Sequence, residues 1–256
     1  MRRKFIYFIE TLSIAGKVSN WYDVFLLFIY PGKERILLLK SGIKFKLNHH
    51  LDAHVIKEVF YDKDYGLNLS NPKIILDVGA HIGTFSIYSA LKFPNSKIYS
   101  FEPRSDTFKR LNFNIRSNSF TNIKAYRLGL AAKSGERLLY KPNLTGLSNL
   151  YIRKNSNEGV GRERIEVITL TKALKSVGAK RCDLLKLDCE GAEYEILLNT
   201  PEEIFKRIDN LVIEYHDNIS GHTHEELTKW LKKIGYKIRT VANQFDQSIG
   251  FIYATR

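Results

Sequence analysis

The segment Ile74-Ile-Leu-Asp77-Val-Gly79-Ala-His-Ile-Gly83-Thr-Phe85 predicts a buried strand, a tight turn and the start of a helix. The short apolar run that precedes the glycines is typical of a strand inside a parallel sheet. Gly79 and Gly83 allow a sharp turn and a close approach of the backbone to a ligand. The spacing is not that of dinucleotide-binding turns, and Asp77 would repel a phosphate. The turn therefore favours a cationic or zwitterionic ligand.

An acidic residue ends the next predicted strand, which reads 97–101 followed by Glu102-Pro103. A carboxylate at the tip of the second strand is placed to accept hydrogen bonds from both hydroxyls of a ribose. A glycine turn with two nearby acids and no phosphate-binding signature indicates S-adenosylmethionine as the ligand.

Strands and helices alternate from the glycine turn to the end of the chain. This alternation predicts a doubly wound α/β fold, a mostly parallel sheet with helices on both faces. The last two strands are consecutive, which predicts an antiparallel pair at one edge. We also expect β-structure around a loop between 136 and 170. The predicted strands are 74–78, 97–101, 123–128, 184–187, 210–214, 236–241 and 248–254, and the predicted helices are 84–93, 105–117, 190–198 and 223–234.

Polar residues also gather at the end of the strand 184–187. Lys186, Asp188 and Glu190 stand at alternate positions, so they would share one face if the strand extended that far. Open α/β sheets bind their ligands at the carboxyl ends of the strands. The alternative to a ligand site is a ladder of salt bridges on the surface.

Four motifs resemble the FkbM family of S-adenosylmethionine-dependent methyltransferases. They are Asp77-Val-Gly-Ala-His-Ile-Gly-Thr-Phe-Ser, Phe101-Glu-Pro, Leu111-x-x-Asn114-x-x-x-Asn118 and Lys186-x-Asp188-x-Glu190-Gly-Ala-Glu193. The last motif is the specific one, because glycine turns occur throughout the class I methyltransferases. The resemblance covers 42–256 and implies a Rossmann-like seven-stranded sheet. It also implies methyl transfer, mostly to oxygen, on glycans or natural products.

The resemblance implies that Asp77, Gly79 and Gly83 line the cofactor and that Glu102 binds its ribose. His81 departs from the family pattern, in which asparagine is commoner at this position. The predicted cofactor-binding set is Asp77, Gly79, Ala80, His81, Gly83, Phe85, Glu102, Pro103 and Asp188.

Methyl transfer is an in-line displacement, and a general base assists it when the acceptor is a hydroxyl. Asp188 ends the fourth strand and His216 follows the fifth, so both are candidate bases beside the cofactor. Glu190 is a third catalytic candidate, which could orient a partner or bind the substrate. No metal is assigned, because Lys186 opposes a site in which Asp188, Glu190 and Glu214 converge on a cation.

The positive charge is concentrated in one part of the chain. The net charge is +13, and residues 101–181 carry 17 basic and 6 acidic residues. This asymmetry favours an anionic partner, so we expect a glycan or small-molecule hydroxyl acceptor with anionic character. An RNA methyltransferase is the first alternative, disfavoured because no RNA-binding module is recognised. A non-catalytic cofactor-binding or membrane-associated scaffold is the second.

The N-terminal region, 1–70, is predicted to form a helical cap and a hairpin before the methyltransferase domain, 71–256. Its apolar stretches, Phe5–Ile9 and Val24–Tyr30, are too short to span a bilayer. We favour a cap packed on the domain, and peripheral membrane contact is the alternative. The two cysteines exclude a disulfide scaffold, which indicates a cytoplasmic protein.

Overall fold

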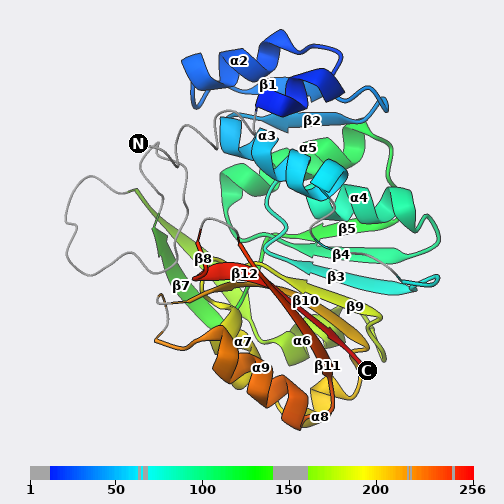
Figure 1. Cartoon of the computed structure of the whole chain (residues 1–256), viewed down its shortest axis with the longest axis vertical. Coiled ribbons are helices and arrows are strands. Elements are labelled where there is room, and N and C mark those ends of the chain that lie inside the picture. The colour runs from blue at the N-terminus through cyan, green and yellow to red at the C-terminus, as the bar shows by residue number, and fades with distance from the viewer. Residues whose placement is uncertain are drawn as a thin grey trace.

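A seven-stranded sheet in the order β11-β12-β10-β9-β3-β4-β5 forms the centre of the molecule (Figure 1). Five strands pair in parallel, and β12 pairs antiparallel with both of its neighbours. The predicted Rossmann-like fold and the antiparallel pair at the edge are therefore confirmed. The strands are β3 Ile74–Val78, β4 Lys97–Phe101, β5 Ile123–Tyr126, β9 Leu184–Leu187, β10 Asn210–His216, β11 Lys237–Ala242 and β12 Ile249–Thr255.

The computed structural model describes residues 12–62, 65, 69–140, 161–217, 219, 221–243 and 246–256. The apolar stretch at 5–9 and most of the predicted loop between 136 and 170 lie outside these described residues. None of the helices in the described ranges is long and apolar enough to cross a membrane.

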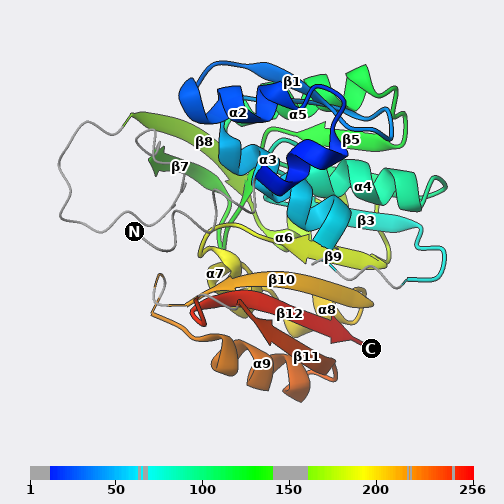
Figure 2. The ribbon, with the colours of Figure 1, turned by 45° about the horizontal axis from the view of Figure 1, so that its top comes forward.

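The helices form one layer on each face of the sheet (Figures 1 and 2). Successive residues of a strand point to opposite faces, so Ile75 of β3 joins one core and Leu76 joins the other. Helices α3, α4 and α5 pack on the first face, and α6, α7 and α9 pack on the second. The helices are α3 His50–Lys57, α4 Thr84–Lys92, α5 Ser105–Ser117, α6 Leu170–Ser176, α7 Glu193–Leu198, α8 Glu202–Phe205 and α9 His224–Lys233.

The region between 123 and 210 contains elements that the sequence predicted only in part. A second, three-stranded sheet has the order β6-β8-β7, built from β6 Gly129–Leu130, β7 Gly135–Tyr140 and β8 Arg162–Ile168. The strands β7 and β8 confirm the expected β-structure around the 136–170 loop. The short helices α6 and α8 were missed, because one or two turns give too few positions for a helical period to be recognised.

The N-terminal extension contains a short hairpin, as predicted, and packs on the same face as α4 and α5. The 3-10 turn η1 Ile14–Lys17 leads into α2 Tyr22–Ile29, and β1 Arg35–Leu38 then pairs antiparallel with β2 Lys44–Leu47. A π-helical turn, η2 Glu58–Asp62, continues α3. Buried side chains of the extension, Leu27 and Phe45 among them, belong to one core with Ile75 of the sheet. The division of the chain at 70/71 stays a prediction.

Two asparagines of α5 join this extension to the sheet layer. The Asn114 side chain accepts the Lys46 N–H at 2.6 Å and donates to the Lys46 carbonyl at 3.3 Å. One turn later, Asn118 accepts the Lys44 N–H at 2.8 Å and donates to the Lys44 carbonyl at 2.7 Å. Four helical residues rise about 6 Å and two strand residues about 6.6 Å. The Asn-x-x-x-Asn spacing therefore lets two amides pair with the edge of β2 as a neighbouring strand would.

We predict that Asn114→Ala lowers the free energy of unfolding by about 2–4 kcal/mol, because it leaves buried backbone groups of Lys46 and Ile82 without partners. The matched control is Asn112→Ala in the same helix, whose side chain bonds only to Phe108 in its own helix. The control should change stability by less than about 1 kcal/mol. Urea unfolding followed by circular dichroism measures both, and equal losses would contradict the role given to Asn114.

Candidate functional site

The glycine turn after β3 is held against the tips of its two neighbouring strands. The N–H groups of Gly79 and Ala80 both donate to the Phe101 carbonyl at 3.0 Å. Gly79 has φ +75°, and a Cβ there would collide with the Asp188 carbonyl oxygen. Glycine is therefore required at 79 both by the backbone angle and by the close approach of the two strand ends.

Lys186 connects β3, β9 and the glycine turn from a buried position. Its ammonium donates to the Gly79 carbonyl at 2.8 Å and lies 3.3 Å from Asp77 Oδ1 and 3.3 Å from Asp188 Oδ2. Burial opposes the charged form, but the two carboxylates outweigh it and raise the pKa of Lys186. Lys186 is therefore a permanent cation at the strand tips.

Asp77 lies beneath the turn and is fully buried. Its Oδ2 accepts a hydrogen bond from Ser86 at 2.6 Å, and its Oδ1 faces Lys186. The carboxylate is thus surrounded by protein groups, and its contact with a ligand stays a prediction.

Glu102 follows β4 and is held by two backbone donors. Its Oε2 accepts the His81 N–H and its Oε1 accepts the Arg104 N–H, each at 3.0 Å. Burial raises the pKa of Glu102 to about 7, although these hydrogen bonds oppose the shift. Each carboxylate oxygen has a second acceptor position, so this side chain fits the two hydroxyls of a ribose.

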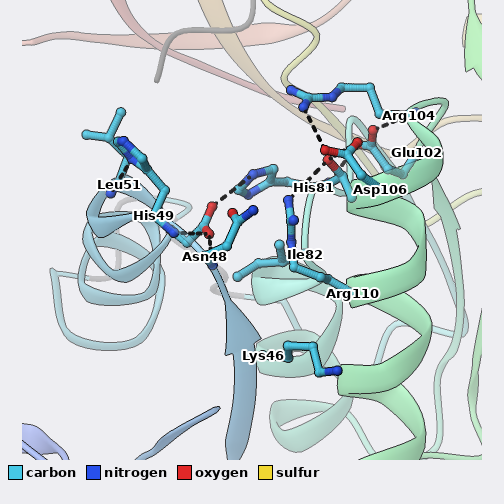
Figure 3. Close-up of polar contacts among 12 residues, drawn as sticks. Lys46, Asn48, His49, Leu51, His81, Ile82, Glu102, Arg104, Asp106 and Arg110 are labelled. Atoms are coloured by element: carbon cyan, nitrogen blue, oxygen red, sulfur yellow. Dashed lines mark hydrogen bonds and ion pairs between the residues drawn. The ribbon is translucent and has the colours of Figure 1, made fainter. Parts of the chain in front are cut away.

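His81 links the glycine turn to the N-terminal extension (Figure 3). Its Nε2 lies 3.2 Å from Asp52 Oδ1, and Asp52 Oδ2 accepts the N–H groups of Asn48 and His49 at 3.0 and 3.1 Å. Burial lowers the pKa of His81 despite the nearby Asp52. The histidine at this position therefore contacts the start of α3, while 39% of its side chain stays exposed to solvent.

Three predicted catalytic residues come together at the ends of β9 and β10. One ligand atom each from Asp188, Glu190 and His216 lies within 4.8 Å of the other two. His216 Nε2 is 3.7 Å from Glu190 Oε2, and its Nδ1 is 3.5 Å from Glu193 Oε1. Burial would lower the pKa of His216, but the adjacent carboxylates raise it to about 10. His216 is therefore an imidazolium at neutral pH.

The two carboxylates of this cluster have different acidities. Burial alone would raise the pKa of Asp188, but Lys186 and His216 lower it, so Asp188 is ionised at neutral pH. Burial raises the pKa of Glu190 to about 7, although His216 opposes the shift. Glu190 is thus the carboxylate of this pair that titrates near neutral pH.

The structure corrects two expectations about Glu190. The strand β9 ends at Leu187, and Glu190 has a left-handed backbone with φ +54°, so it neither extends the strand nor starts the helix. The helix begins at Glu193, whose carboxylate accepts the N–H groups of Cys189 and Gly191. These bonds fold the segment into a turn, which a pattern of alternating charges does not reveal.

Tyr65 is a site residue that sequence reasoning missed. Its hydroxyl lies 3.2 Å from both Asp188 Oδ2 and Glu214 Oε2. Its ring packs edge-on against Phe85 at 5.1 Å and Phe251 at 5.2 Å. No local signal marks this tyrosine, because it reaches the strand tips from the N-terminal extension through tertiary packing alone.

The predicted residues thus form two neighbouring groups. One is the glycine turn with Glu102, and the other is the cluster of Asp188, Glu190 and His216. Phe85 is buried beneath the turn in contact with Tyr65. Among the described residues, Asp217, His224 and Glu225 form another group whose possible ligand atoms lie within 4.8 Å of one another. The individual roles of all these residues remain predictions.

The turn and the cluster fit S-adenosylmethionine. The Glu102 carboxylate offers two acceptors for a ribose, and the ionised Asp188 suits a positively charged ligand. The buried Lys186 fixes the carbonyl of Gly79 from below, so the turn is held in place before a ligand binds.

The comparisons with known proteins give one consistent result. The sequence pattern of the methyltransferase FkbM domain matches residues 77–238, more than half of the chain. Methyltransferase sdnD of Sordaria araneosa is 34% identical over 189 residues, covering 62% of this chain and 73% of that protein. The 31-O-demethyl-FK506 methyltransferase FkbM of Streptomyces tacrolimicus is 27% identical over 194 residues, covering 63% of this chain and 73% of that protein.

A further relative and a solved structure agree with these matches. The hexuronic acid methyltransferase AglP of Haloferax volcanii is 26% identical over 183 residues, covering 72% of this chain and 70% of that protein. The crystal structure of methyltransferase FkbM from Methylobacillus flagellatus KT shares the fold, with a TM-score of 0.54 at 15% identity. That match covers 98% of this chain, which spans 59% of the solved chain. The chain belongs to the FkbM family of S-adenosylmethionine-dependent methyltransferases.

Proposed function

We propose that this methyltransferase methylates a hydroxyl of a glycan or a related small molecule. The observation that carries the proposal is the pair Asp188 and Glu190, one ionised and one titrating near neutral pH, beside the glycine turn. Two relatives support this acceptor class by their names: one specifies a 31-O-demethyl compound, which is an oxygen acceptor, and the other a hexuronic acid, which is an anionic sugar.

When bound, S-adenosylmethionine supplies an electrophilic methyl group on a sulfonium. Glu102 binds the ribose, and the glycine turn binds the cofactor's amino-acid part through its backbone. Asp77 acts on this site through Lys186, because its own carboxylate is fully buried. Asp188, ionised beside Lys186, stabilises positive charge on the cofactor.

Glu190 is the general base in this proposal. A base is most effective when its pKa lies near the working pH, and two carboxylates whose surroundings separate their pKa values mark different roles. The acceptor oxygen forms its bond to the methyl carbon as the carbon–sulfur bond breaks, and the hydroxyl proton passes to Glu190. His216 is not the base, because as an imidazolium it has no acceptor nitrogen. It orients Glu190 instead.

Tyr65 is a positioning residue for Asp188. Burial raises the pKa of Tyr65, so its hydroxyl stays a neutral donor. Burial also raises the pKa of Glu214 well above its usual range. A protonated Glu214 can donate to the Tyr65 oxygen while Tyr65 donates to Asp188, which fixes the orientation of the ionised carboxylate.

The proposal also covers the charge of the acceptor and the location of the enzyme in the cell. The excess of basic residues in 101–181 supports an anionic acceptor. We also propose that the protein works in the cytoplasm and touches a membrane surface through its N-terminal region.

The acceptor class is tested by incubating the purified protein with methyl-labelled S-adenosylmethionine and acidic glycans, neutral glycans, lipids or RNA. We expect label in a glycan or small-molecule fraction, stable to mild base as an ether is. Label in tRNA or rRNA would instead establish the RNA enzyme. Cofactor binding without transfer to any of these acceptors would favour the scaffold.

We predict that Glu190→Gln lowers kcat by about 100-fold or more, because the amide cannot accept the proton. The dissociation constant of S-adenosylmethionine should change less than about threefold, since a base contributes to the reaction step rather than to cofactor binding. Asp188→Asn should lower kcat and also weaken the binding of S-adenosylmethionine. The control is Glu203→Gln on the exposed start of α8, which should alter neither. Full turnover in Glu190→Gln would refute the assignment.

We predict that turnover is independent of divalent metal ions. Lys186 and His216 already supply two positive charges beside Asp188 and Glu190, so a further cation is not needed to neutralise the carboxylates. Activity should stay within about twofold after treatment with EDTA. An activity that EDTA abolishes and one divalent ion restores would show that the cluster is a metal site.

A further inference from the structure

We propose that the outer face of α2 and β1 binds the surface of a membrane that contains anionic lipids. This deepens the proposed membrane contact by naming its surface and its partner. The face consists of Trp21, Tyr22, Phe25, Ile29, Tyr30 and Ile36, which we call the aromatic face. The experiment below measures membrane binding and does not depend on methyl transfer. A negative result would therefore refute the membrane contact without bearing on the proposed reaction.

The aromatic face gathers most of the exposed apolar side chains. Six of the nine large apolar residues that are exposed in the described part of the chain belong to it, and each of the six is between 40% and 62% exposed. Tyr22, Phe25 and Ile29 stand at i, i+3 and i+7 of α2, so they share one side of the helix. Trp21 packs edge-on against Phe25 at 5.8 Å, which makes the patch continuous.

The opposite side of α2 is already occupied by the protein core. Val24 and Leu27 are fully buried among residues of the first core. A helix that is apolar on both sides is usually covered on both, yet α2 lies in the outermost layer of the molecule (Figure 1). The outer side therefore presents apolar surface that a partner would remove from water.

The hairpin holds the backbone of Ile36 against the start of α2, and exposed lysines follow both elements. The Asn20 side chain donates to the Ile36 carbonyl at 2.7 Å, which holds the start of α2 against β1. After α2, the Lys33 N–H donates to the Tyr30 carbonyl at 3.3 Å. After β1, the Lys40 N–H donates to the Lys17 carbonyl at 2.9 Å. Lys33 and Lys40 are exposed, and the Lys17 ammonium lies over the Tyr61 ring, 5.4 Å from its centroid.

The charge pattern selects an anionic surface over a second copy of the chain. The two acidic residues in 12–48 are already paired, since Asp23 contacts Arg35 at 2.9 Å and Glu34 contacts Lys46 at 3.2 Å. A symmetric dimer through this face would bring like charges together, because residues 12–48 carry six basic and two acidic side chains. An anionic bilayer would neutralise the lysines while Trp and Tyr rings enter the headgroup region, where such rings are favoured.

Trp21 offers a direct optical test. The chain has two tryptophans, and Trp230→Phe keeps an aromatic ring against Phe205 while leaving Trp21 as the single reporter. We expect the Trp21 emission to shift to shorter wavelength with vesicles containing about 30% phosphatidylglycerol. The shift should be weaker with pure phosphatidylcholine and should fall as salt is raised to about 0.5 M.

Substitutions at exposed positions distinguish binding through the aromatic face from non-specific hydrophobic binding. Phe25→Ser with Ile29→Ser should lower vesicle partitioning by about tenfold or more, because it removes apolar contact area. The matched control, Leu91→Ser with Val241→Ser, also removes two exposed apolar side chains but leaves the face intact, so it should bind as the parent does.

Other outcomes would overturn the proposal. The proposal is wrong if the protein does not bind vesicles, or if it binds both lipid compositions equally. It is also wrong if both double variants lose binding to the same extent. Sedimentation velocity tests for a dimer. A dimer that Phe25→Ser with Ile29→Ser dissociates would show that a second copy covers the aromatic face.

Discussion

The candidate site depends on one buried cation placed between two strand tips. Lys186 lies within 3.3 Å of both Asp77 and Asp188 and donates to the Gly79 carbonyl. Without it, two carboxylates and a backbone carbonyl would meet in a buried space with no positive charge to balance them. A buried ion pair is costly to break because the remaining charge stays desolvated. The glycine turn and the acidic end of β9 are therefore held as one unit.

The position of Lys186 also gives the acidic residues different protonation states. Asp188 lies beside Lys186 and stays ionised, whereas Glu190 lies farther along the turn, paired with His216, and its pKa is raised to about 7. Glu193 builds this arrangement by folding the backbone between them through its bonds to Cys189 and Gly191. The Lys-x-Asp-x-Glu-Gly-Ala-Glu motif is thus a fixed arrangement of charges in which each acidic residue has a separate structural task.

Much of the fold was predictable from local pattern, and the parts that were not share a physical reason. The strands of the sheet are short apolar runs between turn residues, and the glycine turn follows from sterics at Gly79. The turn at Glu190 was missed because a left-handed backbone and the carboxylate of Glu193 decide it. Tyr65 was missed because it joins the site through packing of the extension, which no spacing records. The charge state of His216 likewise follows from neighbours that only the fold brings together.

The claim that Glu190 accepts the acceptor proton is tested most directly by the pH dependence of kcat/KM, which reports ionisations of the unliganded enzyme. A base must be deprotonated to act, so we predict that kcat/KM rises with pH through an apparent pKa near 7 and then levels off. The residual activity of Glu190→Gln should lack that rise. A wild-type profile that is flat between about pH 5 and 9, or a rise that persists unchanged in Glu190→Gln, would contradict the assignment.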